Sequence, residues 1–284
     1  MGIFSDILLT VDFDRTFTAT DTTIPRRNLE AVGYFMENGG AFTINTGRSL
    51  PMAQLFRDIV PTNAPLLLYN GSSAYDVHSG ELQLCKPIPL DIREVVTHLQ
   101  EKFPTLTVEI QGIDAHYIFR KDALWEDFCQ NNNCAWGYKD PEAIPGPFIK
   151  FSLYGQFHAN TVASMYQGEA EEIALCDEAE RYVQERYGHA VDAFRACARI
   201  IDFHAKGASK LQAARDLQKK LGRKILICVG DAPNDVPMLK GADYAFCPSD
   251  GVVADQFPNV CPCGEGAVAD VIYEKIPGIL QNNP

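Results

Sequence analysis

Several features of membrane, secreted or nucleic-acid-binding proteins are missing from this sequence of 284 residues. No uninterrupted apolar stretch is long enough to span a bilayer, and the first residues lack the basic and apolar regions of a secretory signal. Basic residues are outnumbered, with 25 Lys and Arg against 37 Asp and Glu and a formal net charge of −12. Nucleic-acid binding requires a basic surface. We therefore expect a cytoplasmic protein that contacts neither a membrane nor nucleic acid.

Paired cysteine signatures are also missing. The nine cysteines are an odd number and are scattered, and several lie in apolar runs typical of strands. Cys261 and Cys263 are separated by one residue, which is neither the Cys-x-x-Cys spacing of redox sites nor a paired zinc signature. The pattern predicts reduced thiols in the core, and it does not favour metal binding at Cys261 and Cys263.

What the sequence does contain is a pair of carboxylates at the end of an apolar run. Residues 7–11 (ILLTV) are typical of a strand buried on both faces, and Asp12 and Asp14 follow it. In an extended chain, the side chains of Asp12 and Asp14 project to the same side. Two like charges in one small space require a cation between them or a proton on one of them. The pair is therefore a candidate active site, although a polar exit from a strand would look similar.

A second buried-strand pattern, at residues 224–229 (KILICV), also ends in acids, Asp231 and Asp235. In open parallel α/β sheets the ligand crevice lies at the carboxyl ends of the strands, so acids at two such ends can meet although they are far apart in sequence. Hard oxygen ligands without His or Cys nearby favour Mg²⁺ over zinc or copper. The sequence therefore predicts a Mg²⁺ site.

Two further segments carry polar groups at the end of a strand or the start of a helix, and together they predict a site for an anion. Residues 41–46 are typical of a strand, and at its end the hydroxyl of Thr46 and the backbone N–H groups of a helix start could hold a phosphoryl group. Lys210 begins an amphipathic helical pattern and supplies a cation. Taken alone, Thr46 or Ser49 could instead cap a helix, and Lys210 could be a surface ammonium.

In order and spacing, these four segments together resemble the haloacid dehalogenase superfamily, whose members mostly transfer phosphoryl groups through an aspartyl phosphate. Asn70 with Gly71, and residues 230–239, are similar to the Cof-type sugar-phosphatase subfamily. The resemblance spans most of the chain, with a looser match in the middle. One departure is Arg15, which stands where family members usually have glycine. Its guanidinium could meet a substrate anion or point to solvent, and we favour the second interpretation.

The resemblance implies a role for each matching residue. Asp12 is expected to be the nucleophile and Asp14 the general acid and base. Binding of the substrate phosphate is expected from residues of three motifs: Thr46, Gly47, Lys210 and Asn234. Thr46 and Lys210 are also expected to take part in catalysis. Mg²⁺ is expected to bind the carboxylates at the two strand ends, Asp12, Asp14 and Asp231. Asp235 is expected to contact these ligands without binding the metal itself.

The order of the predicted elements indicates a core interrupted by an insertion. Strands first alternate with helical patterns, and from about residue 87 helices and antiparallel strands follow. We expect an α/β fold with a doubly wound parallel-sheet, Rossmann-like core, residues 1–86 and 204–284. An inserted α+β cap, residues 87–203, would determine substrate choice.

The leading hypothesis is a Mg²⁺-dependent phosphatase, monomeric or homodimeric, that hydrolyses a small phosphorylated metabolite such as a sugar phosphate. A phosphomutase of the same superfamily would use the same first steps and return the phosphoryl group to a sugar. A regulatory protein that binds a phosphorylated ligand or a protein partner without turnover is the third alternative, and the intact Asp12 and Asp14 argue against it.

Overall fold

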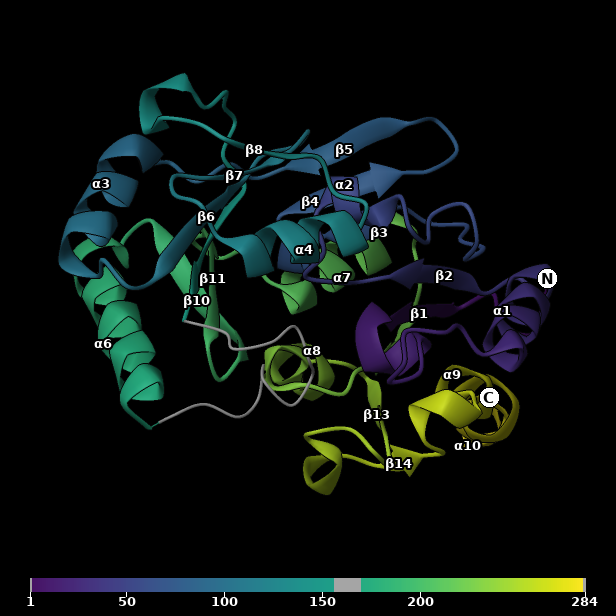
Figure 1. Ribbon diagram of the computed structural model, residues 1–284. Helices are drawn as coiled ribbons and strands as arrows, with labels where there is room; N and C mark the ends of the chain where they lie inside the picture. Colours follow the sequence, from purple (N-terminus) through teal and green to yellow (C-terminus); the bar gives the residue numbers. More distant parts are fainter. Residues whose placement is uncertain (1, 156–169, 283–284) are drawn as a thin grey trace. The chain divides into compact units, whose positions relative to one another are not determined.

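A computed structural model describes residues 2–155 and 170–282, which fall into two compact units (Figure 1). The first unit comprises Met1–Gly47, Phe56–Leu84 and Ser209–Pro284. The second comprises Arg48–Leu55 and Cys85–Ala208. That the second unit determines substrate choice stays a prediction.

A parallel sheet forms the centre of the first unit. Its strand order is β14-β13-β12-β1-β2, and every neighbouring pair is parallel. The strands are β1 (Ile7–Val11), β2 (Ala41–Ile44), β12 (Ile225–Val229), β13 (Tyr244–Pro248) and β14 (Asn259–Val260). The apolar runs of β1 and β12 are buried almost throughout, as a parallel sheet covered on both faces requires.

The order of the strands places a site at one edge of this sheet. From β1 the chain moves outward to β2, and it later returns to β12, on the other side of β1, before continuing to β13 and β14. The winding therefore reverses between β1 and β12, which confirms the predicted doubly wound core. Ligands of open α/β sheets bind at the carboxyl ends of the strands at such a reversal. The residues after Val11 and Val229 occupy this position.

Helices cover the sheet of the first unit. α7 (Lys210–Lys220) and α8 (Val236–Lys240) pack on β1 and β12 through one buried apolar cluster that includes Leu8, Ala213, Ala214, Leu217, Leu226, Cys228, Met238 and Leu239. α1 (Arg26–Glu37) packs against α9 (Ala267–Asp270) and the following turn η7 (Val271–Lys275), which leads into α10 (Ile276–Asn282) at the end of the chain (Figure 1). The rings of Tyr34 and Tyr273 are 5.6 Å apart there.

A short antiparallel sheet completes the first unit. It contains β3 (Leu66–Leu68), β4 (Ser73–Asp76) and β5 (Glu81–Cys85), in that order. A single parallel bridge between Asn45 and Leu67 joins β3 to the chain that leaves β2. The turn between β3 and β4 thereby comes to lie against the start of α7.

The second unit is built on a six-stranded sheet with the order β10-β11-β9-β6-β7-β8. All neighbouring pairs are antiparallel except β7 with β8. The strands are β6 (Thr107–Gln111), β7 (His116–Ile118), β8 (Trp136–Tyr138), β9 (Lys150–Tyr154), β10 (Val191–Cys197) and β11 (Ile200–Ala205). The helices are α2 (Leu50–Ala53), α3 (Ile92–Lys102), α4 (Ala123–Asn131) and α6 (Ala170–Tyr187). This arrangement confirms the predicted α+β class of the insertion.

The two faces of this sheet differ because side chains alternate along each strand. One face, with Val108, Ile110, Phe151 and Phe203, packs in an apolar cluster with α3 and α6. Polar side chains are buried on intervening positions: Glu109, Gln111, His116, Lys150, Ser152, Asp202 and His204. The second unit thus contains an unusually polar interior next to an ordinary apolar core.

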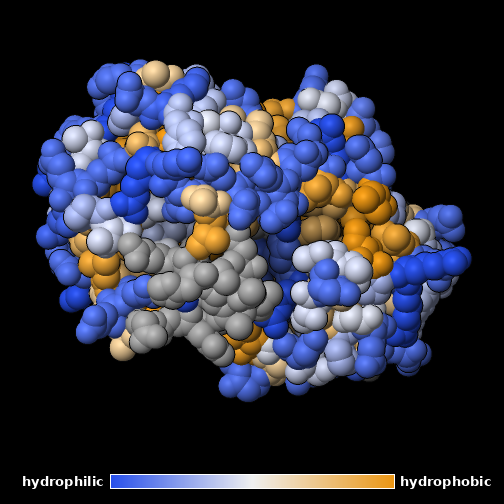
Figure 2. All heavy atoms as spheres, viewed as in Figure 1, coloured by the Kyte–Doolittle hydropathy of each residue, from blue (hydrophilic) through white to orange (hydrophobic). Residues whose placement is uncertain are grey.

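The face of the molecule in Figure 2 is largely hydrophilic, with smaller apolar areas. Large apolar side chains that are exposed are few among the described residues: Ile3, Tyr34, Leu55, Ile59, Tyr138, Val252 and Tyr273. Within the described ranges, no helix combines the length and the apolar character that crossing a membrane requires.

Gly71 is the glycine on which the start of α7 depends. Its φ is +88°, and a Cβ at this position would lie 2.3 Å from the carbonyl oxygen of Ser209, directly before α7. Both the backbone conformation and the lack of space therefore exclude a side chain.

A Gly71→Ala variant should lose about 3 kcal/mol of the free energy of unfolding, since left-handed strain and a backbone clash add. Gly222→Ala is the matched control, because its φ is also positive, +65°, but nothing lies within 4 Å of a Cβ there. That variant should lose only about 1 kcal/mol. Urea unfolding followed by circular dichroism measures both, and equal losses would show that the approach to Ser209 is unimportant.

Candidate active site

Asp12 lies where β1 ends. Its backbone N–H donates to the carbonyl oxygen of Val229 at 2.9 Å, which extends the pairing of β1 with β12 by one residue. Its side chain is buried and accepts a hydrogen bond from Lys210 Nζ at 2.6 Å. Burial raises the pKa of Asp12 well above its usual value, the charge of Lys210 lowers it, and the neighbouring carboxylates raise it.

Lys210 is the buried cation of the site. Ser209 caps α7 by accepting a hydrogen bond from the backbone of Gln212, and Lys210 is the first residue of the helix. Its ammonium donates to Asp12 Oδ1 and to Asp235 Oδ1, each at 2.6 Å. Burial lowers the pKa of Lys210, but the two carboxylates outweigh burial and raise it overall. Lys210 therefore stays charged and joins two strand ends.

Asp235 organises the turn after β12. Its Oδ2 accepts hydrogen bonds from the backbone N–H groups of Asp231 and Ala232, both at 3.1 Å. Gly230 has no room for a side chain, because a Cβ there would lie 2.6 Å from Asp235 Cβ. Both carboxylate oxygens of Asp235 are thus committed to Lys210 and to the turn.

Asp231 is held less completely. Its Oδ1 accepts a hydrogen bond from Thr16 Oγ1 at 3.0 Å. Its Oδ2 is buried, and within residues 2–155 and 170–282 it accepts no hydrogen bond. Burial raises the pKa of Asp231 to about 7, and the charge of Asp235 contributes. A buried carboxylate oxygen without a donor is costly unless a cation neutralises it.

These carboxylates fit a magnesium ion. Oxygens of Asp12, Asp231 and Asp235 all lie within 4.8 Å of one another. Since the oxygens of Asp235 already accept hydrogen bonds, Asp12 and Asp231 are the residues suited to bind the metal directly. Carboxylate oxygens at one point are the donor set that Mg²⁺ prefers.

Asp14 lies outside this group of three. It belongs to the short helical turn η1 (Phe13–Phe17), is half-buried, and is close enough for its charge to raise the pKa of Asp12. Asp14 itself has extended backbone angles, but the N–H of Phe17 donates to the carbonyl oxygen of Asp12 at 3.2 Å, so the chain turns back directly after β1. The structure thus brings Asp14 near Asp12 and does not include it in the carboxylate cluster. Its assignments as a metal ligand and as the general acid and base stay predictions.

Our expectation for Arg15 was wrong. The side chain does not simply point to solvent, because its Nε lies 3.9 Å from Asp231 Oδ2 and the side chain is only 23% exposed. The residue has a φ of +59°, a left-handed conformation that glycine adopts more readily than arginine. Arg15 therefore takes the backbone conformation of a glycine and adds a positive charge beside Asp231.

Thr46 and Gly47 lie at the end of the next strand. Thr46 is buried, its N–H donates to Leu67 O at 2.9 Å, and its carbonyl accepts from Asn70 N–H at 3.0 Å. A Cβ on Gly47 would be only 3.0 Å from Asn70 Oδ1. There is therefore little room for a side chain at this position. The alternative that Ser49 caps a helix is confirmed, because α2 begins at Leu50 and the side chain of Ser49 accepts a hydrogen bond from the N–H of Met52.

Asn234 is half-buried in the turn η4 (Pro233–Asp235), between Pro233 and Asp235. It is therefore next in sequence to the carboxylate that holds Lys210. None of the contacts described above involves its side chain, so its assignment as a phosphate-binding residue stays a prediction.

Sequence reasoning missed two positioning residues. Thr16 holds Asp231, and it could have been found because it is two residues after Asp14 in the same motif. Asn45 donates from Nδ2 to the carbonyl oxygen of Lys210 at 2.9 Å and so fixes the first turn of α7. Nothing in the sequence distinguishes Asn45 from an ordinary polar residue at a strand end.

Comparisons with known proteins agree with this geometry. A family model described as haloacid dehalogenase-like hydrolase matches residues 9–252. A comparison with curated proteins found none that matches.

Solved structures share the fold. A haloacid dehalogenase-like hydrolase from Bacteroides thetaiotaomicron has a TM-score of 0.77 at 20% identity, covering 95% of this chain and 98% of its own. One from B. subtilis has a TM-score of 0.75 at 16% identity, covering 94% and 99%. The sugar phosphatase BT4131, of haloacid dehalogenase subclass IIB, has a TM-score of 0.74 at 18% identity, covering 96% and 99%.

The family model spans most of the chain and includes all the predicted motifs, from Asp12 to Asp235. The superfamily that the sequence resembles is therefore confirmed. This chain belongs to the haloacid dehalogenase-like hydrolase family.

Proposed function

We propose that the protein is a Mg²⁺-dependent phosphatase that hydrolyses a small phosphorylated metabolite of the sugar-phosphate class. One observation carries the proposal: Asp12 is held by Lys210 and lies beside Asp231, which keeps one buried oxygen without a hydrogen bond among the described residues. The structural neighbour BT4131 is a sugar phosphatase, which supports the substrate class. We expect the protein to act in the cytoplasm, as a monomer or homodimer.

Charge is the first obstacle to this reaction, because a phosphate monoester is an anion and its attacker is a carboxylate. Lys210 offsets part of this repulsion at Asp12. Asp12 and Asp231 are the residues to hold Mg²⁺, which when bound supplies positive charge at the transferring phosphoryl group. We assign the binding of the phosphate oxygens to Thr46, Gly47 and Asn234.

Two half-reactions follow from the residues. In the first, a carboxylate oxygen of Asp12 forms a bond to phosphorus, the bond from phosphorus to the ester oxygen breaks, and Asp14 gives its proton to the leaving alcohol. In the second, Asp14 takes a proton from water while that water attacks phosphorus, and phosphate leaves Asp12. A mutase would return the phosphoryl group to a sugar instead, and a binding protein would stop before the first half-reaction.

Asp12→Asn should lower phosphate release from glucose 6-phosphate and p-nitrophenyl phosphate roughly 10³-fold or more, since the attacking group is lost. Asp6→Asn is the matched control at the opposite end of the same strand, where Asp6 pairs with Lys224 on the surface. It should leave the rate unchanged.

The same phosphate-release measurement, made with Mg²⁺ and with a chelator, tests the metal. Wild-type activity should disappear with the chelator and return with added Mg²⁺. Binding of the sugar phosphate without any phosphate release would contradict the phosphatase proposal.

Asp14→Asn should slow hydrolysis of alkyl phosphates by roughly 10²–10⁴-fold, because their poor leaving group needs a proton. With p-nitrophenyl phosphate, the variant should still release nitrophenolate in the first turnover and then slow, since this leaving group departs unprotonated. Stopped-flow absorbance distinguishes the two phases. A wild-type rate on alkyl phosphates would exclude Asp14 as the acid.

A further inference from the structure

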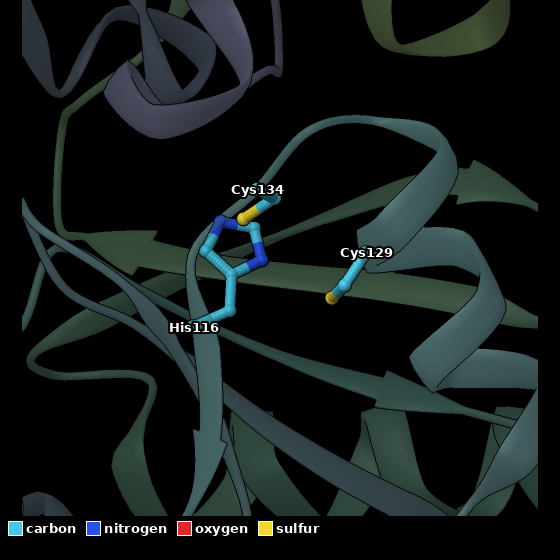
Figure 3. A group of neighbouring side chains, drawn as sticks. All are labelled: His116, Cys129 and Cys134. Atoms are coloured by element: carbon cyan, nitrogen blue, oxygen red, sulfur yellow. The ribbon is translucent and has the colours of Figure 1, made fainter.

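A second group of potential metal ligands lies in the second unit, and the proposed phosphatase reaction does not use it. Figure 3 shows His116, Cys129 and Cys134 gathered around one point. One imidazole nitrogen of His116 and the two sulfur atoms all lie within 4.8 Å of one another. The three residues are buried, with exposed fractions of 0%, 0% and 6%.

The fold fixes where these three side chains lie. Cys129 is in the last turn of α4, and the chain then returns so that the N–H of Cys134 donates to Cys129 O at 2.9 Å. From there it runs directly into β8, which pairs in parallel with β7. His116 begins β7, and its N–H donates to Ala135 O at 2.9 Å. One β-α-β unit thus brings the imidazole beside both thiols.

The orientation of His116 is also fixed. Its Nδ1 is 2.7 Å from Glu109 Oε1, and Trp125 Nε1 donates to the same oxygen at 3.0 Å. The other oxygen of Glu109 accepts from Gln111 Nε2 at 2.7 Å and from the hydroxyl of Tyr154 at 2.6 Å. A carboxylate held by so many donors favours a proton on Nδ1 and leaves the lone pair on Nε2, to which the hydroxyl of Ser49 donates.

We propose that His116, Cys129 and Cys134 form a binding site for Zn²⁺ in the second unit, separate from the magnesium site. Two thiolates and an imidazole are ligands that zinc prefers, and magnesium does not. A histidine whose second nitrogen is held by a carboxylate is the usual arrangement at zinc sites. Around one tetrahedral zinc, ligand atoms lie roughly 3.5–4 Å apart, so small side-chain shifts bring these three within range.

The fourth position has a neighbouring oxygen. Ser49 Oγ lies 2.7 Å from His116 Nε2 and is itself buried. Zinc on Nε2 takes the position of this hydrogen bond, so the hydroxyl of Ser49 must turn away from Nε2, and it or a water then completes four ligands. Since Ser49 also caps α2, bound zinc would connect α2, the end of α4 and β7 within the second unit. The role of such a site is structural.

Zinc content tests the proposal on the intact chain. Protein purified under reducing conditions without chelator should contain one equivalent of Zn²⁺ by elemental analysis. Cys134→Ser should lose it, whereas Cys261→Ser, a partly buried cysteine of the first unit, should keep it. An absence of zinc that persists after zinc is added to the reduced wild type would overturn the proposal. So would a disulfide between Cys129 and Cys134 in the protein isolated without reductant.

Cobalt distinguishes this site from the carboxylate cluster and avoids dependence on a variant that fails to fold. Co²⁺ added to the reduced wild type should give the near-ultraviolet absorption of thiolate bound to cobalt, and oxygen ligands cannot produce it. Asp12→Asn should retain this absorption in full, so the zinc site and the proposed phosphatase activity can fail independently. Cobalt binding without a thiolate band would overturn the assignment of the ligands.

The zinc should stabilise the second unit by mass action. A zinc-selective chelator, added with Mg²⁺ in excess, should lower the unfolding temperature of the wild type and leave that of Cys134→Ser unchanged. Glu109→Gln should weaken zinc binding 10–100-fold, because the carboxylate that holds the zinc-binding histidine is lost. Zinc affinity unchanged in Glu109→Gln would contradict the role given to His116 Nε2.

Discussion

The balance of charge around Lys210 is the constraint on which the first unit depends. Three buried carboxylates, Asp12, Asp231 and Asp235, face a single buried ammonium, so three negative charges and one positive charge leave −2 at the strand ends. A divalent cation restores neutrality, and Arg15 contributes from the edge of the site. Without such compensation the carboxylates at the strand ends must take up protons, in line with the raised pKa values of Asp12 and Asp231. In the proposed reaction this imbalance favours binding of a divalent cation, whose charge then offsets that of the anionic substrate.

The fold positions this charge through backbone contacts rather than through the acids alone. Asp12 and Asp231 follow adjacent parallel strands at the reversal of the winding. Lys210 reaches them because Gly71 allows the start of α7 to approach closely, and because Asn45 holds the carbonyl oxygen of Lys210. Each of these residues is ordinary by itself, and the site exists because the topology brings them together.

Much of this arrangement could be predicted from the sequence, because buried parallel strands are continuous apolar runs and polar residues at their ends are conspicuous. The acids after residues 7–11 and 224–229 and the lysine at the start of α7 were found in this way. Arg15 could not be placed, since its backbone conformation and its contact with Asp231 depend on tertiary structure. The cluster of His116, Cys129 and Cys134 was missed for a similar reason: its ligands lack a paired zinc spacing and meet only when β7 pairs with β8.

The most direct test of the account is whether the phosphoryl group passes through Asp12. Wild type mixed with ³²P-labelled p-nitrophenyl phosphate and Mg²⁺, then quenched in acid within the first turnover, should carry label on the peptide that contains Asp12. Hydroxylamine should remove this label, as expected for an acyl phosphate. Complete turnover with no labelled protein at any quench time would contradict the account, because the phosphoryl group would then go directly to water.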